Sequence, residues 1–121
     1  MAYDDNNVFA KIIRGELPAD KVVENEFALA FRTRDPLTEI HVLIVPKGKY
    51  ENILDFVSNA SAEEQAGFWR LAAETARALG IKGDYNVAAN SGSNAPVAKQ
   101  TVFHFHLHLM AGEIIRKPHN S

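Results

Sequence analysis

The chain lacks cysteine altogether, which excludes a disulfide-stapled scaffold and any chemistry that needs a thiolate. It also lacks an apolar run near the ~20 residues that a bilayer-spanning helix requires. Its first residues, MAYDDNNVFAKII, are acidic and polar, whereas a signal peptide begins with basic residues and continues with an apolar stretch. These absences predict a cytoplasmic protein that does not associate with membranes.

An excess of positive charge is missing as well. The formal net charge is -2, so the chain has no basic field that would attract nucleic acid. Hydrophobic residues make up 46% and charged residues 23% of the 121 residues, the proportions of an ordinary globular protein. We therefore expect residues 1–121 to form a single domain with a core of its own.

The pattern of apolar and turn-forming residues predicts an α+β fold around an antiparallel sheet. Strands are expected at residues 21–26, 27–34, 39–45, 84–89 and 102–109, where apolar runs are bounded by turn residues. A short helix is expected between Asn6 and Gly15, and a long one between Ser61 and Gly80. Ser61 and Glu64 have the spacing of a capping box, and a glycine commonly follows the last turn of a helix.

The long helix carries two adjacent apolar stripes. One stripe is expected to pack on the sheet and consists of Phe68, Leu71, Ala72, Thr75 and Leu79. The second consists of Trp69, Ala73 and Ala76. It is either a further part of the core or a contact with a second subunit, and both interpretations stay open.

Three of the five histidines lie at every second position of the run TVFHFHLHLM, residues 101–110. Because side chains alternate between the two faces of a strand, His104, His106 and His108 are expected to share one face. A fourth histidine, His41, lies in another predicted strand. The opposite face of the run is apolar and is expected to be the buried one: Phe103, Phe105, Leu107 and Leu109.

This row of imidazoles has three interpretations. As a solvated strand face it would be unusual, because Lys, Glu, Thr and Ser normally fill such faces. As a metal site it is poorly arranged, because positions i and i+4 of a strand lie ~13 Å apart and only a neighbouring pair, helped by His41, could meet one ion. As a phosphoryl-transfer site it fits best. A neutral imidazole can attack phosphorus while a neighbouring imidazole supplies a proton, and His106 has an imidazole on either side.

The run HFHLHLM resembles the His-x-His-x-His-x-x signature, with x apolar, of the histidine triad (HIT) family. Further segments are similar to the nucleotide-binding, Hint-type branch of that family: VFAKIIRGELPA at residues 8–19, ALAFRTRDPLTEIHVLIVPK at residues 28–47 and YNVAANSGS at residues 85–93. Because these segments occur in order over nearly the whole chain, the resemblance is far more specific than the triad alone. The short N-terminal part resembles that of bacterial members.

The resemblance implies a five-stranded antiparallel sheet with two helices, and a homodimer in which the two sheets join. It implies a hydrolase, independent of metals and cofactors, that cleaves nucleoside 5'-phosphoramidates, with purines preferred, into a nucleoside monophosphate and an amine. The reaction would pass through a nucleotidyl-His106 intermediate. Two alternatives stay open, namely a nucleotide-binding regulatory dimer with weak catalysis and a dinucleoside polyphosphate hydrolase.

The resemblance also implies site residues by position. His106 would be the nucleophile and His108 would contact the phosphate, while His104 and His41 would complete the imidazole network. Thr101 stands where the family commonly has a serine hydroxyl near the leaving group. The implied nucleotide-binding set is Phe9, Ile12, Phe31, Arg32, Thr33, Leu43, Asn90, Gln100, Thr101, His106 and His108.

Three features depart from the family pattern. Thr33 stands where an acidic residue usually binds both ribose hydroxyls, and a carboxylate is the stronger acceptor for such bonds. The loop at residues 90–100 carries the sequence APVAK where a glycine pair is common, which predicts a reshaped mouth of the pocket. The tail EIIRKPHNS lacks the tryptophan of eukaryotic members, so the resemblance implies no preference for a leaving group.

Overall fold

The computed structural model describes residues 2–116 and contains one five-stranded antiparallel sheet with the strand order β1-β2-β3-β5-β4. The strands are β1 (Lys21–Glu24), β2 (Ala28–Arg32), β3 (Thr38–Pro46), β4 (Asn86–Ala88) and β5 (Leu107–Ile114). The helices within this range are α1 (Val8–Ile13), α2 (Ile53–Asn59) and α3 (Ala62–Ala78). The predicted α+β fold and its five antiparallel strands are confirmed. Part of the C-terminal tail discussed above lies outside the described residues.

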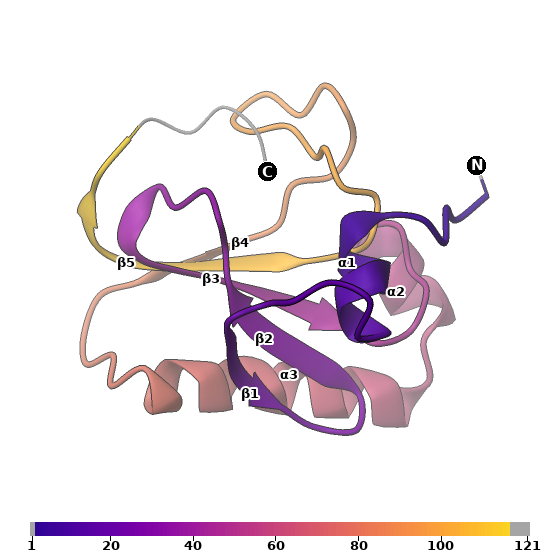
Figure 1. Ribbon diagram of the computed structural model, residues 1–121, viewed down its shortest axis with the longest axis horizontal. Helices are drawn as coiled ribbons and strands as arrows, with labels where there is room; N and C mark the ends of the chain where they lie inside the picture. The colour runs from indigo at the N-terminus through magenta and orange to yellow at the C-terminus, as the bar shows by residue number, and fades with distance from the viewer. Residues whose placement is uncertain (1, 117–121) are drawn as a thin grey trace.

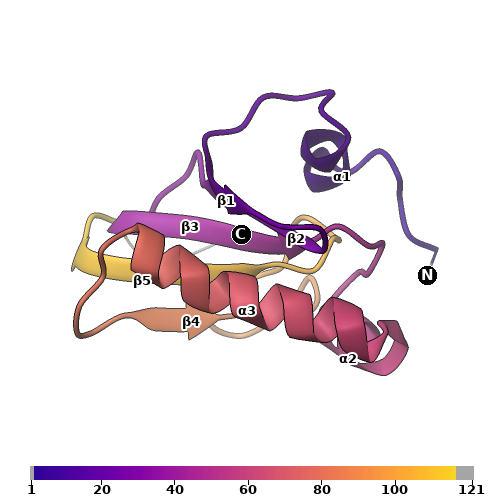
Figure 2. The same ribbon diagram turned by 90° about the horizontal axis from the view of Figure 1, so that it is seen from below.

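Helices cover both faces of the sheet. In Figures 1 and 2, α3 runs across one face of the sheet and α1 lies over the other. Strand β2 shows the resulting division, because Ala28 and Ala30 belong to a core cluster with Phe68 of α3. The residue between them, Leu29, belongs to a second cluster with Phe9 of α1. Since both faces are covered, residues 28–31 of β2 and 42–45 of β3 are apolar without alternating with polar residues.

The long helix begins and ends where the sequence predicts. The hydroxyl of Ser61 accepts a hydrogen bond from the backbone N–H of Glu64, and the Glu64 carboxylate accepts one from the backbone N–H of Ser61. Gly80 adopts a φ of 69°, a left-handed conformation that favours glycine after a helix. The stripe that was expected to pack on the sheet is buried at Phe68 and Leu71, whereas Trp69 of the second stripe is 43% exposed.

Both expected helices are present as α1 and α3, and within residues 2–116 there is a third, α2, which the sequence did not predict. The side chain of Asn52 caps its start by accepting a hydrogen bond from the backbone N–H of Asp55. Phe56 is its only buried residue. A helix of seven residues spans fewer than two turns, which gives too short a pattern for apolar periodicity to detect.

Among residues 2–116, the helices lack the length and the apolar composition that a membrane-spanning helix requires.

The last strand begins later than the sequence predicts. The expected strand at 102–109 is replaced by β5 from Leu107 to Ile114, so His104 and His106 precede the strand. The backbone before Leu107 is held by other parts of the chain, since the N–H of Phe105 donates to the carbonyl of Tyr50 at 2.7 Å. Strand β5 pairs with β3 on one side and with β4 on the other.

Candidate functional site

The four histidines come together on the face of the sheet that α1 covers. His41 on β3 and His108 on β5 occupy diagonal positions of neighbouring strands, because His108 stands directly opposite Leu43. The sequence predicted that only the opposite, apolar face of the triad would be buried, and this was wrong. His104, His106, His108 and His41 have only 1%, 2%, 5% and 5% of their surface exposed. Imidazoles are therefore part of the interior on this side of the sheet.

A hydrogen bond fixes the ring of His106 in one orientation and one tautomer. Its Nδ1 lies 2.8 Å from the backbone carbonyl oxygen of His104, and since that oxygen can only accept, Nδ1 carries the proton and donates. In a neutral ring the other nitrogen, Nε2, then holds a free lone pair. This Nε2 is the only buried side-chain nitrogen or oxygen in residues 2–116 that has no hydrogen-bond partner.

Hydrogen bonds also fix the protons of His41 and His108. The backbone N–H of Leu37 donates to Nδ1 of His41, so the Nε2 of His41 must carry a proton. Nε2–H of His41 donates a hydrogen bond to Nδ1 of His108, with the two nitrogens 2.8 Å apart. Because Nδ1 of His108 accepts, Nε2 of His108 is an N–H donor. The amide nitrogen of Asn90 lies 3.5 Å from this Nε2, and since two donors cannot pair, we assign the Asn90 oxygen to that position by an amide flip.

Burial keeps the imidazoles neutral. It lowers the pKa of His104 to about 4. Burial, with added repulsion from His106 and His41, lowers the pKa of His108 to about 3. Burial is also the main reason that the pKa values of His41 and His106 are lowered. At pH 7 a neutral N–H of His108, instead of an imidazolium, is thus available to an anion.

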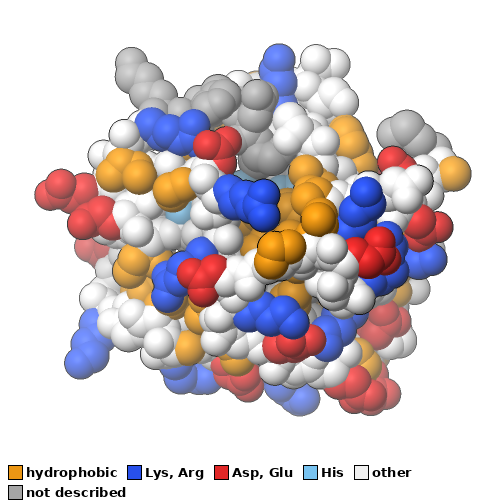
Figure 3. Space-filling model, viewed as in Figure 1, with side chains coloured by type: hydrophobic (Ala, Val, Ile, Leu, Met, Phe, Trp, Pro, Cys, Tyr) orange, Lys and Arg blue, Asp and Glu red, His pale blue; other side chains and the backbone are white. Residues whose placement is uncertain are grey.

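A cavity of about 770 Å³ opens beside the histidines. Its apolar end lies between α1 and the sheet and includes four residues that the sequence predicted for a base pocket: Phe9, Ile12, Phe31 and Leu43. Its polar end includes four further residues of the predicted set: Arg32, Thr33, Thr101 and His108. In Figure 3, histidine atoms are visible between hydrophobic and basic side chains on this side of the molecule. His106 does not line the cavity itself, but its ring packs against Phe9 with the centroids 4.9 Å apart.

Besides His106, two residues of the predicted nucleotide-binding set do not line the larger cavity. Gln100 is 2% exposed, and its amide bonds the backbone N–H of Gly92 and the carbonyls of Glu51 and Val102, so it fixes the loop from within. Asn90 lines a second cavity of about 230 Å³. His108 lines both cavities and therefore lies on the wall between them.

Two carboxylates at the polar end were not predicted as site residues. Asp20 and Asp35 line the larger cavity together with Thr33. Asp20 lies 3.3 Å from Arg32, and Asp35 lies 2.6 Å from Arg116. The hydroxyl oxygen of Thr33 accepts a hydrogen bond from the backbone N–H of Asp35. Neither aspartate has a sequence signal of its own, because isolated acidic residues in loops are common on protein surfaces.

Known proteins resemble this chain in sequence and in fold. The family model of the HIT domain matches residues 14–114. A HIT-like protein of Azospirillum brasilense is 44% identical over 111 residues, which are 91% of this chain and 88% of that protein. Two similar solved structures are described as HIT family hydrolases. The one from Clostridium thermocellum has a TM-score of 0.79 at 34% identity, with 93% of this chain and 95% of that chain covered. The one from Legionella pneumophila has a TM-score of 0.78 at 37% identity, with 89% and 94% covered. The chain belongs to the HIT domain family.

Proposed function

We propose that the protein is a hydrolase of nucleoside 5'-phosphoramidates, in which His106 forms a covalent bond to phosphorus. The observation that carries the proposal is the unpartnered Nε2 of His106. A buried polar atom without a partner destabilises a fold by about 1–3 kcal/mol, so such atoms are rare and need an explanation. A nitrogen that is held with its lone pair free, beside a second imidazole and a cavity, is explained by attack on a substrate.

The reaction would proceed in two balanced halves. In the first, Nε2 of His106 bonds to phosphorus while the P–N bond breaks, and the leaving nitrogen takes up a proton from solvent and departs as an amine. The N–H of His108 can donate to a phosphoryl oxygen as negative charge gathers there. In the second half, water attacks phosphorus and the bond to Nε2 breaks. The nucleoside monophosphate leaves, and the proton that water releases replaces the one consumed.

The larger cavity supports a nucleotide as substrate. The apolar end beside Phe9 and Leu43 suits a flat base, and a cavity of about 770 Å³ has room for a purine nucleotide. The polar end beside Thr33 and Asp35 suits a sugar. Because His108 also lines this cavity, a nucleotide that lies along it would bring its phosphate to the imidazoles.

A homodimer belongs to the same proposal. Strand β4 lies at the edge of the sheet order, where its outer backbone groups are available to another strand. Near this edge Tyr85 and Val87 are 48% and 50% exposed, and Ile114 on the neighbouring strand is 76% exposed. Pairing of two β4 edges would cover these apolar side chains. Light scattering should then give twice the chain mass, and Val87→Asp should give the mass of one chain.

The decisive test compares the wild type with His106→Asn on adenosine 5'-phosphoramidate, each with and without a chelator. Asparagine can still donate to the carbonyl of His104 but cannot attack phosphorus. We expect turnover by the wild type with or without chelator, a loss of at least about a thousandfold in the variant, and a nucleotidyl adduct on the wild type alone by mass spectrometry. Turnover of the variant near the wild-type rate would refute the role of His106. Tight binding of a nucleoside monophosphate without any turnover would favour a regulatory dimer, and faster cleavage of a dinucleoside polyphosphate would favour that substrate class.

A further inference from the structure

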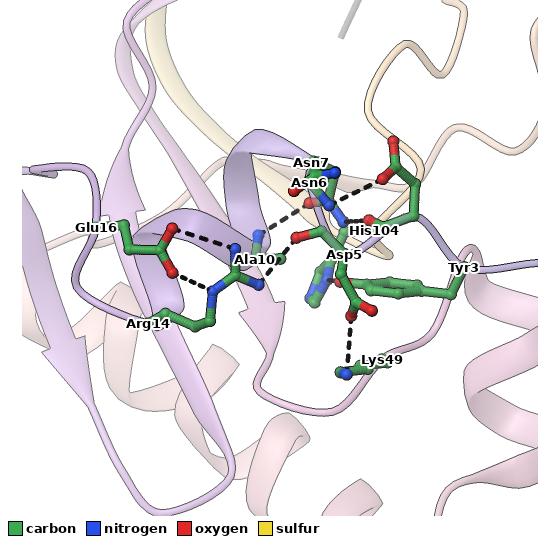
Figure 4. Close-up of polar contacts among 10 residues, drawn as sticks. Tyr3, Asp5, Asn6, Asn7, Ala10, Arg14, Glu16, Lys49 and His104 are labelled. Atoms are coloured by element: carbon green, nitrogen blue, oxygen red, sulfur yellow. Dashed lines mark hydrogen bonds and ion pairs between the residues drawn. The ribbon is translucent and has the colours of Figure 1, made fainter.

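The side chain of Tyr3 reaches the imidazole row from the N-terminal segment. Its hydroxyl lies 2.5 Å from Nδ1 of His104, and the two rings meet edge to face with their centroids 5.7 Å apart. Figure 4 shows the hydroxyl of Tyr3 directed at the His104 ring, although the two residues are 101 positions apart in the chain.

The direction of this hydrogen bond follows from the other side of the ring. Nε2 of His104 lies 2.7 Å from the carbonyl oxygen of Pro46, so Nε2 carries the proton and donates. In the neutral ring, Nδ1 then accepts, and the donor is the hydroxyl of Tyr3. Burial raises the pKa of Tyr3, which keeps that hydroxyl protonated. Both nitrogens of His104 are thereby occupied in one ring orientation.

His104 is in turn the support of His106. The backbone carbonyl of His104 accepts a hydrogen bond from Nδ1–H of His106. This bond keeps the proton of the neutral ring on Nδ1 and leaves Nε2 of His106 unprotonated. Phe9 packs edge-on against both rings, at centroid distances of 6.5 Å from His104 and 4.9 Å from His106. A change in the orientation of the His104 ring should therefore shift the His106 ring, through the carbonyl group of His104 and through Phe9, which contacts both rings.

The segment that carries Tyr3 is anchored independently of the site. The carboxylate of Asp5 lies 2.8 Å from the ammonium group of Lys49, just beyond β3. The carbonyl of Asp5 also accepts a hydrogen bond from Arg14, whose guanidinium pairs with Glu16 (Figure 4). These contacts hold the segment against the body of the protein, which places the Tyr3 ring beside His104.

We propose that Tyr3 is a positioning residue for catalysis, whose hydroxyl fixes the ring orientation and tautomer of His104 and thereby aligns His106 for attack on phosphorus. Its kinetic consequence rests on the phosphoramidate hydrolase proposed above, whereas its structural consequence does not. Tyr3 does not line the larger cavity, so its loss affects the chemical step and leaves substrate binding unchanged.

The test uses Tyr3→Phe, which keeps the ring and removes only the hydroxyl. A matched control is Tyr50→Phe, since the hydroxyl of Tyr50 also makes a hydrogen bond, to Glu64 at 2.9 Å, on a group outside the imidazole row. In Tyr3→Phe we expect kcat to fall about fivefold to tenfold, the loss of one hydrogen bond of about 1 kcal/mol, with KM unchanged. Tyr50→Phe should keep the wild-type kcat.

The second measurement does not depend on activity. In ¹⁵N spectra of the imidazole nitrogens, Nδ1 of His104 should move downfield in Tyr3→Phe, toward the position of an unprotonated nitrogen without a donor. The signals of His104 should stay unchanged in Tyr50→Phe. An unchanged Nδ1 signal in Tyr3→Phe would overturn the inference, as would a kcat equal to that of the control. If the wild type does not hydrolyse the phosphoramidate, the proposed function fails, and the ¹⁵N shift alone decides whether Tyr3 holds His104.

Discussion

We expect His104→Leu and His106→Leu to change the free energy of unfolding in different ways, although both substitutions remove a buried imidazole. The two rings differ in how their nitrogens are partnered. His104 bonds Tyr3 and Pro46 through its two nitrogens. His106 bonds one carbonyl and leaves Nε2 without a partner within residues 2–116. Leucine has nearly the volume of histidine, so packing changes contribute little to the comparison.

The expected magnitudes follow from these bonds. His104→Leu removes two hydrogen bonds and leaves the buried carbonyl of Pro46 unpaired, which should destabilise the fold by about 2–4 kcal/mol. His106→Leu also removes a hydrogen bond and leaves the buried carbonyl of His104 unpaired, a loss of about 1–3 kcal/mol, but it removes an unpartnered nitrogen that itself destabilises the fold by about 1–3 kcal/mol. Because these two effects oppose each other, the stability of this variant should stay within about 2 kcal/mol of the wild type, even though it is inactive.

Urea unfolding followed by circular dichroism measures both changes, at one protein concentration because association would add to stability. His106→Leu should be the more stable of the two variants, by about 2 kcal/mol. Equal destabilisation of the two variants would refute the assignment of Nε2 as an unpaired nitrogen that is kept for the reaction.

Three further predictions concern pH, the loop and the sugar. The free energy of unfolding should fall as the pH drops from 6.5 toward 4. In this range the unfolded chain protonates residue 104, whereas folded His104, with its pKa lowered to about 4, stays neutral. The loss from this residue is about 3 kcal/mol, and thermal unfolding as a function of pH measures it. A stability that rises over this range would contradict the neutral imidazoles. Gln100→Leu should destabilise the fold by about 2–3 kcal/mol in urea unfolding, since it removes three buried hydrogen bonds. Thr33→Asp should lower KM for a ribonucleotide substrate about fivefold, because a carboxylate accepts more strongly than a hydroxyl, and should leave KM for the dideoxyribose analogue unchanged. An equal change for both sugars would exclude contact between residue 33 and the diol.

Local patterns in the sequence predicted most of the fold because the relevant signals lie within a few residues of each other. The capping box at Ser61 and Glu64 and the glycine at 80 set both ends of α3. The sequence also predicted the strand that carries His41, and it predicted the strand at His108 in part, since β5 begins only at Leu107. Each of these features is decided by contacts along one element, which a single sequence displays.

Other features of the site depend on contacts that no local pattern reveals. The triad rings are covered in part by Phe9 of α1 and by Tyr3, which alternation along one strand cannot show. The start of β5 at Leu107 depends on a bond from Phe105 to a residue of a distant loop. The approach of Tyr3 to His104 bridges 101 positions, and a lone tyrosine near the N-terminus carries no signal of such a partner.

The position of β5 in the sheet has a consequence for synthesis on the ribosome. This strand is the last within residues 2–116, yet it lies between β3 and β4 in the sheet. Until it has left the exit tunnel, β3 and β4 each present an open edge, and the sheet cannot close. The pairing of β3 with β5 also joins residues as far apart as Thr38 and Ile114, which is a slow step in folding. Until β5 has emerged, the nascent chain should therefore be exposed to aggregation, and a product truncated before β5 would be both unfolded and inactive.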